Sequence, residues 1–406
     1  MKYIILLASL VIQICLGGVY AWSALVPALQ DTVDFSVAQT QIIFGCLFAV
    51  FTLSMVLSGK LLDRLGPRWI ASIGAVLFGA GYVLASFSGG NFPVMLLGIG
   101  VLTGAGTGFG YVCPLTTCMR WFPNRRGLVT GVSMAGFGGG AVLLSALAEH
   151  LLSDGMHVLT FFRWIGLGYG LALLAAALVL RFPESVKAVA SRPASVAKTF
   201  AADPFFFLCL LLGMFCGTFA GMLVIGNLKP IGLAAGVPAV QATAAISVFA
   251  AGNAAGRVTW GWLSDRVDAR LIPIKMTVLG VPIALLAWVS SSAMFIIVSF
   301  AVGFGFGACF VVYAAQVASR YGLARVGGIY PVVFLAYGLA GILGPSLGGW
   351  LYDTTDSYGS AIALGCGVLA VGLIGSTLLL WKANSTAPVG SLEAATEAAA
   401  RGETGY

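Results

Sequence analysis

Charged side chains are scarce in this 406-residue sequence. Only 9% of the residues are Asp, Glu, Lys or Arg, whereas 59% are hydrophobic, and the mean hydropathy is +1.00. Soluble domains carry about 25% charged residues, so a water-soluble globular protein is excluded. Lipid must be the solvent for most of the chain. The short polar stretches between the apolar runs leave no room for a soluble domain of useful size.

Residues that support catalysis or metal binding are also rare. There are two histidines, His150 and His157, and no acidic residue deep in an apolar run, which leaves acid–base or metal chemistry little to work with. The eight cysteines lie in apolar runs without a C-x-x-C pair, as expected of small buried hydrophobic residues. We therefore expect no enzyme, no metal site and no cofactor. The net charge of +7 fits basic residues that flank membrane spans, not nucleic-acid binding.

Long apolar runs are abundant and predict twelve transmembrane helices, since about 20 residues suffice to cross a bilayer. The expected spans are 4–29, 38–60, 70–88, 93–119, 128–152, 160–180, 204–228, 238–262, 272–291, 294–318, 327–351 and 358–381. The first run continues too far for a cleaved signal peptide. The small and polar tail, 382–406, is expected to be disordered.

The basic residues predict the orientation of the spans. With the N-terminus in the cytoplasm, every Lys and Arg falls on the cytoplasmic side or at its boundary except Arg163, Lys229 and Arg257. This asymmetry follows the positive-inside rule. In this scheme Lys275 belongs to the cytoplasmic boundary of the ninth span, and Arg257 is the one charged residue deep in a span.

The two halves of the sequence resemble each other. Gly59–Arg64 (GKLLDR), after the second span, recurs as Gly261–Arg266 (GWLSDR), after the eighth. Parallel repeats of this kind form transporters in which the substrate binds between the halves. We expect a six-helix half at 1–180, a cytoplasmic linker at 181–203 and a second six-helix half at 204–381.

The first copy of the repeat contains the pattern G-x-x-x-D-R-x-G-x-R, which resembles the signature loop of the major facilitator superfamily. The resemblance implies an all-α membrane fold of twelve transmembrane helices in two pseudo-symmetric six-helix halves. Acidic and basic residues at these helix ends would latch the halves together in one state, and their separation would favour the other. The alternative is plain anchoring by positive charge. The latch candidates are Asp63, Arg64, Arg68, Asp265 and Arg266.

Local sequences narrow the resemblance. Gly18–Trp22 (GVYAW) in the first span, Arg120–Gly127 (RWFPNRRG) after the fourth and Val224–Pro230 (VIGNLKP) after the seventh are similar to the oxalate/formate antiporter family. This branch also resembles the animal monocarboxylate transporters. In that family an arginine of the eighth span binds the substrate carboxylate, and Arg257 matches it.

A bound anion would supply the counter-charge that the buried Arg257 lacks. A buried arginine costs several kcal/mol unless it is paired, no carboxylate lies deep in a span, and a guanidinium binds a carboxylate with two hydrogen bonds. Asn253 lies one turn earlier on the same helix face and could hydrogen-bond the substrate. The alternative is an arginine that extends to the cytoplasmic interface. The family resemblance implies further aromatic substrate contacts at Tyr20, Tyr111 and Tyr313.

This sequence departs from the oxalate transporter where that protein has a second cation in the eleventh span. By the motif Phe334–Gly338, that position is Tyr337 here. One arginine balances one carboxylate, and a dianion would keep an unpaired charge, so we expect a monocarboxylate such as lactate, pyruvate or formate. The animal monocarboxylate transporters carry an aspartate where this chain has Asn253, which does not titrate.

Proton coupling is favoured because moving a lone anion inward against a negative-inside potential costs about 2.3 kcal/mol per 100 mV. The proton could reside on the bound carboxylate, on Glu149 or His150, or in a tyrosine–water network. Carboxylate exchange of the oxalate/formate type is the alternative, and a transporter-like sensor without net flux is a third reading. We expect a monomer that contacts lipid in a bacterial inner (plasma) membrane, with both termini in the cytoplasm.

Overall fold

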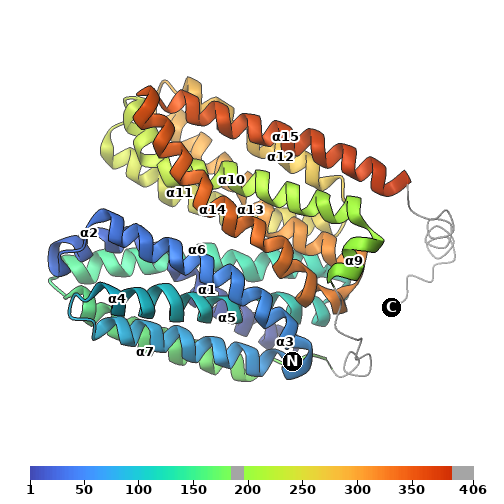
Figure 1. The fold of residues 1–406 in the computed structure, drawn as a ribbon, viewed down its shortest axis with the longest axis horizontal. Helices are drawn as coiled ribbons and strands as arrows, with labels where there is room; N and C mark the ends of the chain where they lie inside the picture. Colours follow the sequence, from blue (N-terminus) through green and yellow to red (C-terminus); the bar gives the residue numbers. More distant parts are fainter. Residues whose placement is uncertain (184–195, 386–406) are drawn as a thin grey trace.

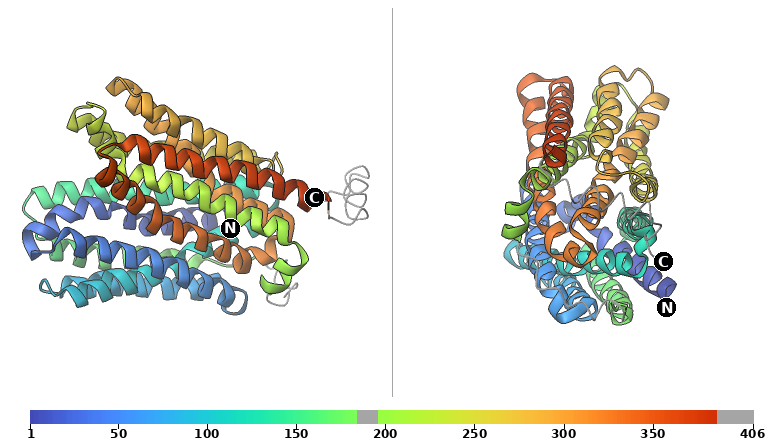
Figure 2. Two further views of the ribbon diagram at one scale, coloured as in Figure 1. Left: turned by 45° about the horizontal axis from the view of Figure 1, so that its top comes forward. Right: turned by 90° about the vertical axis from the view of Figure 1, so that its right-hand side faces the viewer.

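A computed structural model describes residues 1–183 and 196–385, which are almost entirely helical. The first half consists of α1 (Lys2–Gly17), a 3-10 turn (Gly18–Ala21), α2 (Trp22–Val33), α3 (Val37–Ser86), α4 (Phe92–Met95), a π-helical stretch (Leu96–Thr103), α5 (Gly104–Trp121), α6 (Arg126–Ser153) and α7 (Val158–Val179). After the short helix α9 (Val196–Ala202), the second half consists of α10 (Pro204–Ala234), α11 (Ala239–Ser264), α12 (Leu271–Leu285), α13 (Ser292–Tyr321), α14 (Val326–Thr355) and α15 (Tyr358–Ser385). The helices run along the longest axis (Figure 1), and the end-on view in Figure 2 shows the two halves as separate bundles.

The helices account for the twelve expected spans. In the described residues, ten helical segments are long and apolar enough to cross a membrane. One of them, α3, contains two spans, because it continues through the signature loop and bends at Gly66, whose φ of +80° suits glycine. The remaining span is α11, whose polar residues, including Asn253 and Arg257, lower its hydropathy.

One end of the molecule, here called the basic end, carries basic residues where helices begin, end or bend. They include Lys2, Arg68, Arg125, Arg270 and Arg325. α1 begins and α15 ends at this end (Figure 1). Residues 184–195 of the predicted linker, and 386–406 of the tail predicted to be disordered, lie outside the described residues.

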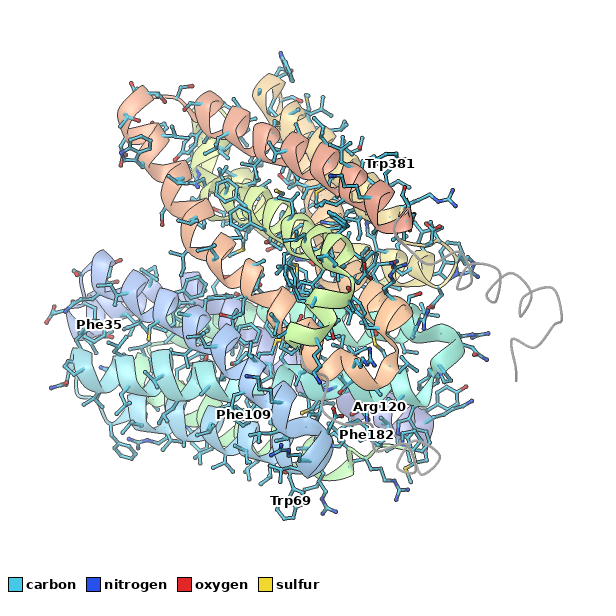
Figure 3. The ribbon with its side chains drawn as sticks, turned by 45° about the vertical axis from the view of Figure 1, so that its right-hand side comes forward. Phe35, Trp69, Phe109, Arg120, Phe182 and Trp381 are labelled. Carbon is cyan, nitrogen blue, oxygen red and sulfur yellow. The ribbon has the colours of Figure 1, made fainter. Side chains whose placement is uncertain are left out.

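Glycines bring the two halves into contact at the basic end. The backbones of α6 and α11 touch at Gly127 and Gly261, where a Cβ on either residue would overlap the carbonyl oxygen of the other. A Cβ on Gly59 of α3 would likewise overlap the carbonyl oxygen of Gly327 of α14. Small residues permit such contacts between membrane helices. Toward the opposite end the halves diverge, as Figures 1 and 3 show.

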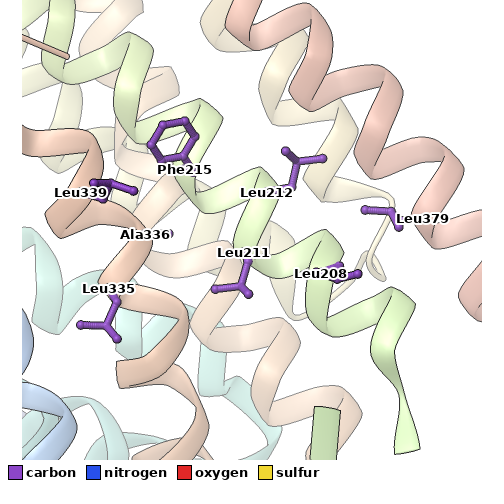
Figure 4. A pocket seen from close by; sticks show the side chains of 8 residues that line it. All are labelled: Leu208, Leu211, Leu212, Phe215, Leu335, Ala336, Leu339 and Leu379. Atoms are coloured by element: carbon purple, nitrogen blue, oxygen red, sulfur yellow. The ribbon is translucent and has the colours of Figure 1, made fainter. Parts of the chain in front are cut away.

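An apolar groove of about 560 Å³ lies between α10, α14 and α15 of the second half (Figure 4). It is lined by Leu208, Leu211, Leu212, Phe215, Leu335, Ala336, Leu339 and Leu379. None of these side chains recognises a charged solute, so a site for an anion must lie elsewhere.

We expect Gly261→Ala to weaken the closed basic end, because its methyl group would overlap the carbonyl oxygen of Gly127. Overpacking of this kind costs about 1–3 kcal/mol, so the apparent melting temperature in detergent should fall by several degrees. Gly139→Ala is the matched control, since nothing lies within 4 Å of a Cβ built at Gly139. Equal melting temperatures for the two variants would contradict the packing role of Gly261.

Candidate functional site

Arg257 of α11 is buried where the two halves meet, with 1% of its surface exposed. Its Nε donates a hydrogen bond to Oδ1 of Asn253 (2.8 Å), and a terminal nitrogen donates to the carbonyl oxygen of Met134 on α6 (2.6 Å). The guanidinium carbon lies 4.3 Å from the ring centroid of Phe310 and 5.9 Å from that of Phe137. Groups from both halves therefore fix the position of the guanidinium.

No carboxylate pairs with Arg257 in the part of the chain that the structure describes. A guanidinium has five N–H donors, and its two hydrogen bonds leave the second terminal nitrogen without a protein acceptor among the described residues. A positive charge in such a dry place is costly unless an anion approaches it. The arrangement is therefore suited to one carboxylate or a similar small planar anion.

Aromatic side chains form the wall around Arg257. The ring of Tyr111 packs edge-on against Phe137 (5.3 Å between centroids) and tilted against Phe334 (5.2 Å). Tyr20 also packs edge-on against Phe137 (5.3 Å). The hydroxyl of Tyr111 is buried and has no hydrogen-bond partner among the described residues, so it can donate to a small polar solute.

Tyr20 and Tyr337 connect the two halves beside this wall. Tyr20 lies in the 3-10 turn between α1 and α2, Tyr337 lies in the middle of α14, and their hydroxyl groups are in direct contact. Tyr337 lies farther from the basic end of its helix than Arg257 does. The tyrosine pair therefore bridges the halves on the side of Arg257 toward which they diverge.

The structure brings together all the predicted substrate-binding residues except Tyr313. The residues that gather are Arg257, Asn253, Tyr20, Tyr111 and Tyr337. The hydroxyl of Tyr313 lies against Gly213 of α10, inside the second half, and its ring centroid is 4.7 Å from Nζ of Lys275. The family resemblance predicted that Tyr313 of α13 would contact the substrate. The rotation of that helix instead turns the Tyr313 side chain away from Arg257.

Lys275 corrects the expectation that Arg257 is the one charged residue deep in a span. It is the fifth residue of α12, its exposure is 1%, and its Nζ lies 3.2 Å from Sγ of Cys309. A long side chain near a helix end can reach water or turn inward. Hydropathy does not distinguish the two, and here the side chain turns inward.

Asp265, a latch candidate, joins the halves through backbone groups. Its two carboxylate oxygens accept hydrogen bonds from the N–H groups of Gly127 (2.7 Å) and Leu128 (2.9 Å), at the N-terminus of α6. Unpaired N–H groups and the helix dipole make such an end a favourable site for a carboxylate. The sequence pattern suggested an Asp–Arg latch, whereas Asp265 caps a helix of the other half.

Asp63 contacts the second half indirectly. Its carboxylate pairs with Arg120 of α5 (2.8 Å), and Arg120 also donates to the carbonyl oxygen of Ala324 in the second half (3.4 Å). The guanidinium of Arg120 stacks on the ring of Phe182 at 3.9 Å, and the two are labelled in Figure 3. The other latch candidates are exposed: Arg64, Arg68 and Arg266.

Glu149 and His150, the predicted proton-coupling residues, lie near the end of α6 remote from the basic end. Both are exposed, and Nδ1 of His150 lies 3.7 Å from a carboxylate oxygen of Asp154. Met134, which contacts Arg257, is fifteen or more residues away on the same helix, or about 22 Å along its axis. The structure therefore does not bring Glu149 and His150 to the Arg257 site.

Phe137, Phe310 and Tyr330 belong to the site but were not identified from the sequence. The hydroxyl of Tyr330 donates to the carbonyl oxygen of Phe310 (3.0 Å), which ties α14 to α13. With 26 phenylalanines in the chain, composition does not single out any of them. A usable signal existed for Tyr330, since it lies seven residues before Tyr337 and shares its face of α14.

Several proteins are similar in sequence to this chain over most of its length. The sequence matches the profile of the Major Facilitator Superfamily over residues 6–272 and 210–402. It is 29% identical over 348 residues to an uncharacterized MFS-type transporter, YhjX, of Escherichia coli (strain K12), covering 84% of this chain and 86% of the relative. It is 26% identical over 362 residues to the oxalate:formate antiporter of Oxalobacter formigenes, covering 85% and 84%. It is 28% identical over 333 residues to monocarboxylate transporter 13 of Rattus norvegicus, covering 77% and 75%.

Solved structures share the fold. The transporter FucP in its outward conformation aligns with a TM-score of 0.70 at 16% identity, covering 93% of this chain and 99% of that one. The proton:xylose symporter XylE, bound to 6-bromo-6-deoxy-D-glucose, aligns with a TM-score of 0.66 at 14% identity, covering 94% and 95%. At these identities the likeness concerns the fold alone.

We expect Asn253→Asp to have opposite effects on stability and on anion binding. The new carboxylate would lie beside Nε of Arg257 and supply the missing counter-charge, so the melting temperature of the anion-free protein should rise. It would also compete with a bound anion, so affinity for a carboxylate should fall at least tenfold, or about 1.4 kcal/mol. Thermal unfolding at neutral pH, with and without L-lactate, measures both.

Asn227→Asp is the matched control for this substitution. Asn227 of α10 is 8% exposed, against 7% for Asn253, and its amide donates to the carbonyl oxygens of Leu223 and Pro345. An aspartate there would be buried without a cation and should lower the melting temperature. A lower melting temperature in both variants would contradict the unpaired state of Arg257.

Proposed function

Because this chain belongs to the Major Facilitator Superfamily and has the fold of its transporters, we propose that it carries small monocarboxylates such as lactate and pyruvate, together with protons, by alternating access. The observation that carries this proposal is the burial of Arg257 between the halves without a carboxylate partner among the described residues. One bound carboxylate would neutralise one guanidinium through two hydrogen bonds.

The surroundings of Arg257 support a monoanion over a dianion. Phe137 and Phe310 lie against the guanidinium, and the tyrosines add hydroxyl groups but no positive charge. The second carboxylate of oxalate would be held among aromatic rings without a counter-charge. The names of the relatives, an oxalate:formate antiporter and a monocarboxylate transporter, support small carboxylates as the substrate class.

We infer that the structure is an outward-facing state whose basic end lies in the cytoplasm of a bacterial cell. The glycine contacts and the Asp265 cap close that end, and the halves diverge at the other. Substrate would reach Arg257 past the contact between Tyr20 and Tyr337. An empty site disfavours closure over a bare cation, whereas a bound anion removes that penalty and lets the halves rock, which would break the contacts of the basic end.

Carboxylate exchange is the second candidate. It is favoured by one observation: among the described residues, no Asp, Glu or His contacts Arg257 to hold a coupled proton. Exchange of one anion for another needs no such group, and it avoids the cost of moving net charge across the membrane.

Proteoliposomes that contain the protein should take up labelled L-lactate in a saturable way when an inward proton gradient is imposed. Arg257→Ala should lower this uptake at least about 100-fold, since it removes charge-assisted hydrogen bonds worth roughly 1.5–3 kcal/mol each. Arg163→Ala, which removes an exposed arginine of α7, should have little effect. Uptake only after a carboxylate is preloaded would favour the exchanger, and full uptake by Arg257→Ala would refute the anchoring role.

We expect Tyr337→Lys to admit dicarboxylates, because it would place a second cation beside the Arg257 site. Oxalate should then compete with lactate uptake at least tenfold more strongly, a gain of about 1.4 kcal/mol. Tyr337→Phe is the control, since it also removes the hydroxyl contact with Tyr20 but adds no charge. An unchanged competition profile in Tyr337→Lys would show that position 337 does not face the substrate.

A further inference from the structure

A second buried cation lies behind α13, away from the Arg257 site. Lys275 of α12 is 1% exposed, its Nζ is 3.2 Å from Sγ of Cys309, and the ring centroid of Tyr313 is 4.7 Å away. Gly217 of α10 provides the space for the ammonium group, because a Cβ at that position would overlap Nζ. The packing of the second half therefore leaves room for this ammonium group.

No carboxylate is available to Lys275 from the helices that surround it. The sequences of α10, α12, α13 and α15 contain no Asp or Glu. On α15 the carbonyl oxygen of Ser376 accepts a hydrogen bond from the thiol of Cys209 (3.7 Å). The titratable side chains that face Lys275 are Cys209 and Cys216 of α10 and Cys309 and Tyr313 of α13.

These neighbours offer poor compensation for a positive charge. A thiol is a weak hydrogen-bond acceptor, and the buried hydroxyl of Tyr313 has no hydrogen-bond partner among the described residues. Within the spans that the structure describes, Lys275 is thus a buried amine without a carboxylate partner.

Lys275 and Arg257 lie on two sides of the same helix. Arg257 stacks on Phe310 of α13, and Lys275 contacts Cys309, the preceding residue. The two cations are therefore separated by roughly one helix diameter, about 10 Å. With an effective dielectric constant of about 20, repulsion at this distance lowers the equilibrium constant for having both groups charged by about tenfold.

We propose that Lys275 is the proton-binding group of the transport cycle. This inference rests on the proton-coupled form of the proposed function. A bound carboxylate cancels the charge of Arg257 and so favours protonation of Lys275 by about tenfold, and by reciprocity the ammonium favours carboxylate binding by the same factor. The proton is taken up by the Lys275 amine from water on one side of the membrane and released to water on the other.

The charges balance over this cycle. One carboxylate anion and one proton cross together, so no net charge moves. The loaded protein holds a neutralised Arg257 and a Lys275 ammonium, and the empty protein holds a bare Arg257 and a Lys275 amine. A Lys275 ammonium beside an empty Arg257 would place two uncompensated cations in the second half, which opposes the leak of protons without substrate.

Lys275→Met and Lys275→Arg distinguish a titrating group from a fixed one, since methionine is never charged and arginine is never neutral. In proteoliposomes both variants should keep lactate–lactate exchange, measured at equal pH and with equal, saturating lactate on both sides, within about threefold of wild type. Uptake driven by an inward proton gradient should fall at least about tenfold in both. Lys229→Met, at an exposed lysine of α10, is the matched control and should keep both activities.

Several outcomes would overturn this assignment. Gradient-driven uptake that survives in Lys275→Arg would mean that a fixed charge suffices, and survival in Lys275→Met would mean that no charge is needed. Loss of exchange together with driven uptake in Lys275→Met would place Lys275 in folding or substrate binding. If wild-type protein itself shows no gradient-driven uptake, proton coupling is removed from the proposed function, and the role of Lys275 with it.

Discussion

A guanidinium held between the halves, with no carboxylate among the described residues to pair with it, is the constraint on which the other features depend. Arg257 lies where α6 and α11 approach each other, and its partners are an amide, a backbone carbonyl and two aromatic rings. These groups orient the charge but do not cancel it. In the proposed function the same charge would bind an anion and would penalise any state that seals the site empty, which would link occupancy to the movement of the halves.

The glycine contacts between α6 and α11 and the position of Arg257 depend on each other. Gly131 of α6 lies directly against the backbone of Arg257, and a side chain there would overlap its carbonyl oxygen. Only because the two helices approach this closely does the carbonyl oxygen of Met134 reach the guanidinium. The packing that closes the basic end thus also supplies a hydrogen bond to the site, so separation of the halves must change the surroundings of Arg257.

The fold was largely readable from the sequence because its determinants are regular. Apolar runs have a fixed minimal length, and the repeated Asp-Arg pattern marks equivalent helix ends. The site was readable only in part. Arg257 and Asn253 share a helix and a face, so spacing alone places them together. Tyr313 and Lys275 depend on how α12 and α13 are rotated and on the space beside Gly217, and no one-dimensional pattern encodes that. The partners of Asp63 and Asp265 likewise come from segments distant in sequence.

The cap on α6 has a consequence for how this carrier can vary between lineages. Asp265 binds the main-chain N–H groups of Gly127 and Leu128. Position 127 must remain glycine, because a Cβ there would overlap the carbonyl oxygen of Gly261, but the donor at position 128 is present whichever residue other than proline occupies it. Substitutions at position 128 therefore leave both donors in place, whereas a side-chain partner could be lost by one substitution. The strength of this contact therefore depends on residue 265 and not on which side chain position 128 carries.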